Sequence, residues 1–390
     1  MFSRRTSWSN HPNKLSTAFE QRLRAGLPVI DLTLSNPTQA KIDYPVTELL
    51  ASLQNTRVLS YQPDPRGLLT ARQAVCDYYA GKNAVLDPSD IFLTASTSES
   101  YSTLMKLLCE VGDTILVPSP SYPLFEYLAQ INDVGLRNYS LAYDGRWHIE
   151  IASVKSAITP NTRAIVIINP HNPTGEFLQA DEYAEIVRIA TDHNCALIVD
   201  EVFIDYKFDR AGFSQTTAAA ADLLTFTLNG LSKLAGLPQM KLGWIAVSGP
   251  EKLTTEAMSR LEIVSDTFLS VNTPVQVALS EFLKLGKEIS TSILTRVKIN
   301  YKHLQDSIRE GSPCGVLNCD GGWNAIIQLP RTKSDEEWAM ELLDKRGIFV
   351  YPGYFFDLRE SGLIVVSLLQ REEIFLRAIT EIVDHIQNSL

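Results

Sequence analysis

Two ionisable side chains in this sequence stand where simple packing would not put a charge. Lys233 lies in NGLSKLAGLPQMKLGW (229–244), directly after an apolar run that is typical of a strand. A lysine amine can serve as a nucleophile or a proton carrier, although a lysine after a strand is usually a solvated loop charge. Asp200 lies inside the apolar run ALIVDEVF (196–203). An ionised carboxylate on a buried strand costs several kcal/mol unless a cation or a strong donor meets it, although such a residue can also cap a neighbouring loop.

Three further polar segments each follow an apolar run: TASTSES (94–100), SPSY (119–122) and NPHNPTG (169–175). Each alone has an ordinary interpretation, since NPTG is a good turn sequence and TASTSES could be the N-cap region of a helix. In an open α/β sheet, ligands bind outside the carboxyl ends of the strands. We therefore expect these three loops, Asp200 and Lys233 to converge on one crevice.

The elements that would position these loops alternate along the chain. Stretches 99–111 and 180–193 carry apolar residues at helical spacing. Between such stretches lie short apolar runs typical of strands buried on both faces. This alternation predicts a mostly parallel sheet covered by helices. The predicted strands are 91–94, 114–118, 164–170, 195–203, 223–229 and 244–249.

The chain of 390 residues exceeds the usual size of a single core. After about residue 250 the pattern changes to helical stretches, roughly 251–310, then a few strands and a final helix at 372–387. We expect an α/β fold with three parts. They are a large domain with a mixed, mostly parallel sheet sandwiched by helices (45–275), a smaller α+β domain (276–390), and a segment (1–44) that packs with the small domain or with a partner subunit.

Composition argues against several functional classes. The net charge is −10 and no basic block stands out, so we expect no nucleic-acid partner. No apolar span of ~20 residues and no secretory signal are evident, so we expect no membrane association. The cysteines show no paired metal-ligand spacing, which favours reduced thiols in a cytoplasmic protein and no metal site. They are Cys76, Cys109, Cys195, Cys314 and Cys319.

Taken together and in this order, the motifs resemble the aspartate aminotransferase-like family of pyridoxal 5'-phosphate (PLP) enzymes, fold type I, class I/II. The resemblance runs from Asn36 to Ser367. Its most specific elements are NPHNPTG, the aspartate of DEVF 28 residues after Asn172, and the serine-lysine pair that ends at Lys233. A cation follows eight residues later, at Lys241. The resemblance implies that PLP is the cofactor.

The resemblance also implies roles around the PLP ring. Lys233 would form the Schiff base with PLP and later move a proton between substrate and cofactor. Asp200 would pair with the pyridine nitrogen and keep it protonated. Asn172 would donate to the ring hydroxyl oxygen. Tyr122 would stack on the pyridine face, unless it is an ordinary core tyrosine.

For the phosphate, the resemblance implies polar loops and a helix N-terminus. Lys241 departs from the usual arginine, which keeps the charge but loses the bidentate fork, and Gly230 stands where relatives often carry a hydroxyl. Tyr61, in YQPDPRG, resembles the tyrosine that reaches the phosphate of a neighbouring subunit, which implies a homodimer. The positions matched to the phosphate site within one subunit are Ser96, Thr97, Ser98, Ser232 and Lys241.

Two departures concern the chemistry. Phe203 stands where relatives have a tyrosine that donates to the ring hydroxyl oxygen, so we expect a higher pKa for the attached cofactor than a tyrosine would give. Val365 stands where relatives bind the substrate α-carboxylate with an arginine. Arg359 and Arg371 flank this strand without matching the motif. Either the carboxylate site is altered, or the donor has no ordinary α-carboxylate, as in a primary amine or a modified amino acid.

Substrate-side positions are implied by the same resemblance. Asn36, Trp323 in GGWNAIIQLP (321–330) and Tyr354 in YPGYFFDL (351–358) would line an apolar or aromatic pocket. The two aromatic residues could equally belong to the core.

The sequence therefore predicts a PLP-dependent aminotransferase that moves an amino group from an amino acid or amine donor to a keto acceptor by a ping-pong mechanism. A PLP-dependent lyase, decarboxylase or racemase of the same fold is the alternative enzyme, because a fold does not dictate a reaction. A PLP-binding regulatory module is the alternative without catalysis. A nicotinamide dehydrogenase is disfavoured, since no G-x-G-x-x-G follows an early strand.

Overall fold

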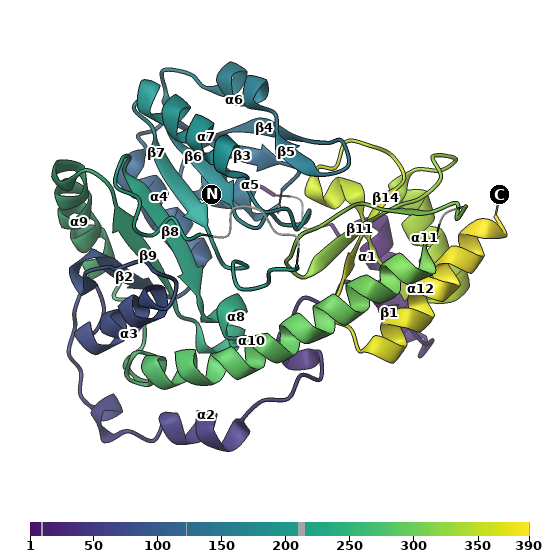
Figure 1. The fold of residues 1–390 in the computed structure, drawn as a ribbon, viewed down its shortest axis with the longest axis horizontal. Helices are drawn as coiled ribbons and strands as arrows, with labels where there is room; N and C mark the ends of the chain where they lie inside the picture. The colour runs from purple at the N-terminus through teal and green to yellow at the C-terminus, as the bar shows by residue number, and fades with distance from the viewer. Residues whose placement is uncertain (9–10, 122, 210–214, 310, 390) are drawn as a thin grey trace.

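The computed structural model describes residues 1–8, 11–121, 123–209, 215–309 and 311–389 (Figure 1). Its main sheet has eight strands in the order β2-β9-β8-β7-β6-β3-β4-β5. Strands β8, β7, β6, β3 and β4 run parallel to one another, whereas β9 is antiparallel to both β8 and β2, and β5 is antiparallel to β4. The bounds are β2 Ile91–Thr94, β3 Thr114–Ser119, β4 Gly135–Tyr143, β5 Trp147–Ile149, β6 Thr162–Ile168, β7 Ala196–Asp200, β8 Thr225–Gly230 and β9 Gly243–Ser248.

Helices cover both faces of this sheet, as expected (Figure 1). On β6, alternate residues enter different clusters: Val166 packs toward α4 and α9, and Ile167 packs toward α6 and α7. A strand buried on both faces shows a continuous apolar run, which is why β6 is readable in the sequence. The helices of the first face are α4 Thr97–Leu108, α5 Leu124–Ile131 and α9 Glu251–Asp266, and those of the second are α3 Leu69–Ala80, α6 Ile151–Ala157, α7 Ala180–Asp192 and α10 Thr273–Ser307.

A smaller antiparallel sheet, in the order β10-β11-β14-β13, follows in the chain and lies at the right of Figure 1. Near it, β1 of the N-terminal segment pairs in parallel with β12. The expected α/β architecture of a large and a small sheet is therefore confirmed. The elements are β1 Ile30–Asp31, β10 Gly315–Val316, β11 Asn324–Gln328, β12 Ile348–Phe349, β13 Tyr351–Pro352, β14 Leu363–Ser367, α1 Lys14–Arg24, α2 Val46–Ser52, α11 Asp335–Arg346 and α12 Glu372–Gln387.

The helix α10 connects the two parts. It is 35 residues long and contacts α3 and α8 (Leu231–Leu234) on the large-sheet side and α12 on the other. Asn272 caps its N-terminus, with the side chain accepting from the backbone N–H of Val275 at 3.2 Å. The predicted domain boundary at residue 275 falls in the first turn of this helix and remains a prediction, as does the boundary at 44.

The helical stretches expected over 251–310 are the helices α9 and α10, and Asn272 and Pro274 start the second one. Two details differ from the sequence-based expectation. Strand β7 ends at Asp200, so the DEVF motif leaves the sheet there. Strands β4 and β5 were not predicted, since β4 is partly exposed and lacks a continuous apolar run.

None of the helices in the described part of the chain combines the length and the apolar character that crossing a bilayer needs.

Gly286 gives a stability prediction for the contact between α10 and the segment that carries Lys233. A Cβ at position 286 would lie 2.5 Å from the Ala235 Cβ and 3.0 Å from its Cα. We expect Gly286→Ala to destabilise the protein by about 1–3 kcal/mol through overpacking, although alanine normally favours a helix over glycine. The thermal midpoint measures this change.

Ser292→Ala, at an exposed position of the same helix, is the matched control and should leave the midpoint nearly unchanged. Adding Ala235→Gly to Gly286→Ala should recover part of the loss, because it removes the closest contact. An unchanged or higher midpoint for Gly286→Ala alone would contradict the close packing of these two segments.

Candidate active site

The carboxyl ends of the central strands meet at one edge of the main sheet. Asp200, the last residue of β7, pairs with Ile168 of β6 and Leu228 of β8. Gly230, at the end of β8, pairs with Gly243 of β9, and Gly243 pairs with the last residue of β2. Because β9 is antiparallel to both neighbours, β2 and β8 end at the same edge. The segments that follow β2, β6, β7 and β8 therefore start side by side.

Asp200 is a buried carboxylate held by two donors. Its Oδ1 accepts from the backbone N–H of Val202 at 3.1 Å, and its Oδ2 accepts from the hydroxyl of Tyr101 at 3.0 Å. Burial raises the pKa of Asp200 to about 6, while these two hydrogen bonds and the charge of Lys233 act in the opposite direction. The group is therefore mostly ionised at pH 7, inside the protein, where a cationic partner would be strongly favoured.

Lys233 lies in α8, just after β8, and its amine faces aromatic rings. Its Nζ is 4.9 Å from the ring centroid of Trp323 and 5.8 Å from that of Phe203. Burial lowers the pKa of Lys233 to about 8, and the carboxylate of Asp200 opposes this shift. A sizeable neutral fraction near neutral pH allows the amine to take up a proton or attack a carbonyl carbon. The hydroxyl of Tyr206 fixes the local backbone by donating to the Lys233 carbonyl at 2.6 Å.

Asn172 and Phe203 each contact the segment that enters β11. The Asn172 Oδ1 accepts a hydrogen bond from Nδ2 of Asn324, on β11, at 2.8 Å. Phe203 packs edge-on against Trp323, with ring centroids 5.3 Å apart. Position 203 is therefore beside the lysine but offers no hydroxyl.

The N-terminus of α4 lies at the same edge. Ser96 caps this helix, accepting from the backbone N–H of Glu99 at 3.2 Å. Thr97 and Ser98 are its first two residues, whose backbone N–H groups have no partner within the helix and can bind an anion. A Cβ on Gly243 would lie 3.3 Å from the Ser96 carbonyl carbon, so the cap and β9 touch.

Ser232 and Lys241 flank the contact between β8 and β9. A Cβ on Gly230 would lie 2.8 Å from the Cα of Gly243, which accounts for glycine at position 230. Ser232 follows Gly230 by two residues, and Lys241 precedes Gly243 by two. Lys241 is exposed, with a left-handed φ of 49°. The turn between β8 and β9 thus contains a serine and a lysine, and it ends at Gly243, which touches Ser96 at the start of α4.

The remaining predicted site residues are placed differently. Tyr122 lies outside the described residues. Tyr61 is 77% exposed. The side chain of Asn36 caps a short turn, with Oδ1 accepting from the backbone N–H of Thr38 at 3.1 Å. Tyr354 is exposed, and its hydroxyl donates to Glu336 at 3.4 Å. Of the three residues predicted on the substrate side, Trp323 contacts Lys233, whereas Asn36 and Tyr354 make their hydrogen bonds to other groups.

Position 365, which the resemblance matches to a substrate-binding arginine, carries an apolar residue and has apolar surroundings. Val365 is fully buried on β14, in a cluster that includes Trp147 and Phe356. The flanking residues Arg359 and Arg371 are both exposed, and Arg371 pairs with Glu373 at 3.5 Å. The contacts of these two arginines therefore give no support to a replacement role in the crevice.

Three residues of the site were missed by the sequence analysis. Tyr101 and Tyr206 lie in segments that read as a helix and as a loop, and nothing in their spacing connects them to Asp200 or Lys233. Asn324 stands next to Trp323 in GGWNAIIQLP, so the segment was noticed but the amide was not. The partners of these three residues are distant in the sequence, so local sequence patterns give no sign of the contacts.

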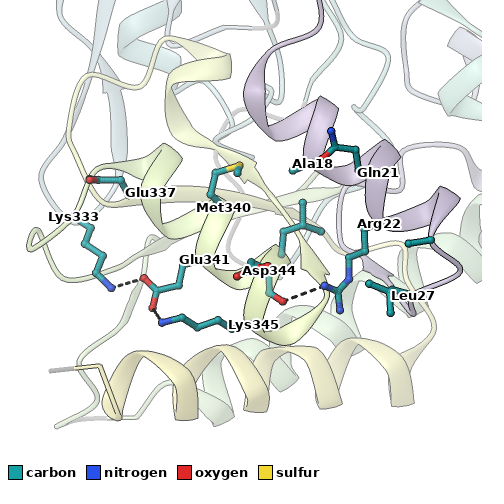
Figure 2. Close-up of a pocket in the computed structure, with 12 residues that line it drawn as sticks. Ala18, Gln21, Arg22, Leu27, Lys333, Glu337, Met340, Glu341, Asp344 and Lys345 are labelled. Carbon is teal, nitrogen blue, oxygen red and sulfur yellow. Dashed lines mark hydrogen bonds and ion pairs between the residues drawn. The ribbon is translucent and has the colours of Figure 1, made fainter.

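A cavity of about 750 Å³ lies elsewhere, between α1 and α11 (Figure 2). Among its lining residues, Glu341 binds both Lys333 and Lys345, and Arg22 donates to the backbone carbonyl of Asp344 at 3.1 Å. No residue of the predicted site lines it. Across the described ranges, no group of three or more His, Cys, Asp or Glu side chains is placed to hold a metal ion.

The fold and the site together define a class of protein. A lysine and a buried carboxylate at the ends of neighbouring strands, in a mostly parallel sheet with helices on both faces, are the framework of PLP enzymes of fold type I. Comparison with known proteins identifies the family. Residues 28–378 match the family model described as Aminotransferase class I and II. The chain belongs to this family, whose members use PLP.

Two relatives and one structure illustrate the similarity. The chain is 32% identical over 269 residues to glutamate-pyruvate aminotransferase AlaA of Escherichia coli (strain K12), which is 69% of this chain and 66% of that protein. It is 32% identical over 342 residues to the protein of the same name from Haemophilus influenzae, covering 85% and 84%. The structure of alanine aminotransferase from Pyrococcus furiosus covers 100% of both chains with a TM-score of 0.90 at 22% identity, which shows a common fold.

The residues present fit PLP. Asp200 is a buried carboxylate whose two hydrogen-bond donors within the described part of the chain, Tyr101 and Val202, are both neutral, which suits a partner for a protonated ring nitrogen. Lys233 supplies an amine with a lowered pKa, and the first turn of α4 supplies backbone donors for a phosphate. Each part of the donor set therefore has a counterpart in the cofactor.

Asp200 gives a pH-dependent prediction. Because burial raises its pKa from the ordinary 3.8 to about 6, the ionised form destabilises the cofactor-free folded protein above pH 6. We expect cofactor-free Asp200→Asn to be more stable at pH 7–8, by about 1–3 kcal/mol, and to have a higher thermal midpoint. The difference should shrink as the pH falls from 6 to 4 and disappear below that range, where the carboxyl is protonated in both folded and unfolded protein.

Asp222→Asn, at an exposed position, serves as control and should show no such pH-dependent gain. Added PLP should reverse the order of the two midpoints, because the wild-type carboxylate then has a cationic partner. A lower midpoint for cofactor-free Asp200→Asn at pH 7–8 would show that this carboxylate is a structural residue instead.

Proposed function

We propose that this chain is a PLP-dependent aminotransferase that transfers an amino group from an amino acid or amine donor to a keto acceptor by a ping-pong mechanism. The single observation that carries the proposal is Lys233, an amine of lowered pKa held among aromatic rings within the electrostatic range of a buried carboxylate. Membership of the class I and II family supports the same reaction type.

We propose that the site holds PLP through three groups of residues. Lys233 would bind it covalently, Asp200 would pair with its ring nitrogen, and Asn172 would donate to its ring oxygen. Ser96, Thr97, Ser98, Ser232 and Lys241 would bind its phosphate. Tyr122, which the family resemblance assigns to the ring face, lies outside the described residues. When bound, PLP supplies an aldehyde that accepts an amine and a ring that accepts an electron pair. Lys233 then moves the proton, since its neutral amine can take one from the substrate α-carbon and release it again.

The substrate class is the finer part of the proposal. The E. coli and H. influenzae relatives are named for glutamate and pyruvate, which favours small amino acids and keto acids here. Val365 offers no charge to a carboxylate, because it is buried in an apolar cluster. We propose that any substrate carboxylate is read by groups other than an arginine on β14. Trp323, beside Lys233, would then form one wall of the substrate pocket.

We also propose a cytoplasmic homodimer. All five cysteines are free thiols, which suits a reducing compartment. Tyr61 is exposed, and the exposed apolar residues Leu59, Ile263 and Phe268 add to the surface on which it could meet a partner. Leu269 lines the same small cavity as Tyr61. In the proposed dimer, Tyr61 of each subunit reaches the phosphate of the other.

Lys233 tests the reaction class. Purified protein with PLP should absorb visible light, and a competent donor should bleach that band and yield a keto product. Donors to compare are L-alanine, L-glutamate and a simple primary amine. Lys233→Ala should lower the transamination rate by about 10²–10⁴-fold, since the proton carrier is lost, whereas Lys252→Ala, an exposed lysine on α9, should not.

Release of ammonia or carbon dioxide without an aminated product would identify a lyase or decarboxylase instead. Conversion of the simple amine alone would support a donor without an α-carboxylate, and rapid conversion of the two L-amino acids would exclude that version. Failure of wild-type protein to gain any visible absorbance with PLP would overturn the proposal.

The shared site can be tested by mixing two impaired subunits. Lys233→Ala removes the amine from its own site, and Tyr61→Ala removes the phosphate contact from its neighbour's site. A mixed dimer has one site with both residues intact. Refolding the two variants together should therefore restore activity above that of either variant alone. If subunits pair at random, the activity should reach about a quarter of that of wild type. Activity that stays at the sum of the two separate variants would rule out sharing through Tyr61.

A further inference from the structure

We propose that Asn324 is a positioning residue that sets which way the Asn172 amide faces, and thereby sets the pKa of the bound cofactor. This inference rests on the proposed function. It goes beyond it by giving a role to a residue of the small sheet that neither a motif nor the spacing of the sequence singled out.

The register of the small sheet places Asn324 on the face toward the crevice. Asn324 pairs with Ser367, and Ile326 pairs with Val365, so these four side chains share one face of the sheet. The intervening residues enter the core with α10 and α12. On the first face, Ile326 and Val365 pack against Trp147, which comes from the large sheet.

Among these four, Asn324 is the group that donates to Asn172. Ile326 and Val365 are apolar, and the hydroxyl of Ser367 donates to the Leu34 carbonyl. Asn324 is half-buried, and its Nδ2 lies 2.8 Å from the Asn172 Oδ1. The small sheet therefore reaches Asn172 through one amide hydrogen bond.

An asparagine amide has an acceptor end and a donor end, and a half-turn about its last bond exchanges them. With Oδ1 engaged by Asn324, the Nδ2 of Asn172 is left to donate elsewhere. A donor directed at the cofactor's ring oxygen stabilises the deprotonated form and lowers the pKa of the bound chromophore. The opposite amide orientation would direct an acceptor at that oxygen and raise the pKa.

The residue at position 203 makes the orientation of the Asn172 amide more important for the pKa of the chromophore. Phe203 has no hydroxyl, although it lies beside the lysine with its ring 5.8 Å from Nζ. It therefore provides no second donor at the ring oxygen, and the direction of the Asn172 amide carries more of the stabilisation.

The test follows the visible absorbance of the PLP-loaded protein as a function of pH, in the absence of substrate. Asn324→Asp offers only an acceptor, so Asn172 must turn its Nδ2 toward residue 324, and we expect the pKa of the chromophore to rise by about one pH unit or more. Asn324→Ala removes the partner without adding charge and should raise the pKa less. Phe203→Tyr, which adds a donor, should lower it.

An Asn172→Ala background separates orientation from charge. In that background the negative charge of Asn324→Asp still acts on the chromophore, but no amide can turn, so Asn324→Ala should have no effect and Asn324→Asp a smaller one. Ile326→Val, on the same sheet face, is the control for packing and should leave the pKa unchanged.

The proposal is overturned if Asn324→Ala leaves the chromophore pKa unchanged while PLP still binds, or if the effect of this variant persists without Asn172. If Asn324→Asp fails to fold, as judged by its thermal midpoint, Asn324→Ala alone decides by the same criterion. A wild-type protein that gains no visible absorbance with PLP would instead refute the proposed function itself, so the two failures are distinguishable.

Discussion

The buried carboxylate of Asp200 is the constraint on which the rest of the site depends. An ionised group inside a protein is stable only if donors or a positive charge meet it, and here a tyrosine hydroxyl and one backbone N–H do so at 3.0 and 3.1 Å. They leave the pKa raised to about 6. The fold thus maintains a partly uncompensated negative charge next to a lysine of lowered pKa, which is an expensive arrangement unless a cationic ring lies between them.

The topology of the main sheet supplies the geometry for that arrangement. Placing β9 antiparallel between β2 and β8 brings the N-terminus of α4 to the same edge as Lys233. The approach is close enough that Gly230 and Gly243 leave no space for side chains between the strands. The proposed covalent anchor, ring partner and phosphate donors are therefore positioned by backbone contacts of the core. The segment that enters the small sheet adds Trp323 beside Lys233 and Asn324 beside Asn172.

Much of this could be predicted from the sequence because the signals are local. The strands buried on both faces are continuous apolar runs, and the polar segments follow them directly, so β6, β7 and β8 and the residues at their ends were found. Other features depend on partners distant in the chain. Tyr101 donates to a residue 99 positions away, and Asn324 to one 152 positions away. Strand β4 is partly exposed and has no continuous apolar run, so it was not predicted. The antiparallel direction of β9 is likewise not encoded in any local pattern of the sequence. Asn36 and Tyr354 were assigned to the substrate side by resemblance alone, and their hydrogen bonds are to Thr38 and Glu336.

The single long helix α10 has a consequence for how this protein can change over evolutionary time. Its 35 residues span about 50 Å without interruption. Gly286, in the N-terminal half of the helix, packs against Ala235, and α12 packs toward its C-terminal end (Figure 1). Inserting or deleting one residue between these two contacts would turn everything beyond by about 100°. The length of this helix is therefore expected to be inherited unchanged, whereas the surface loops are free to grow or shrink.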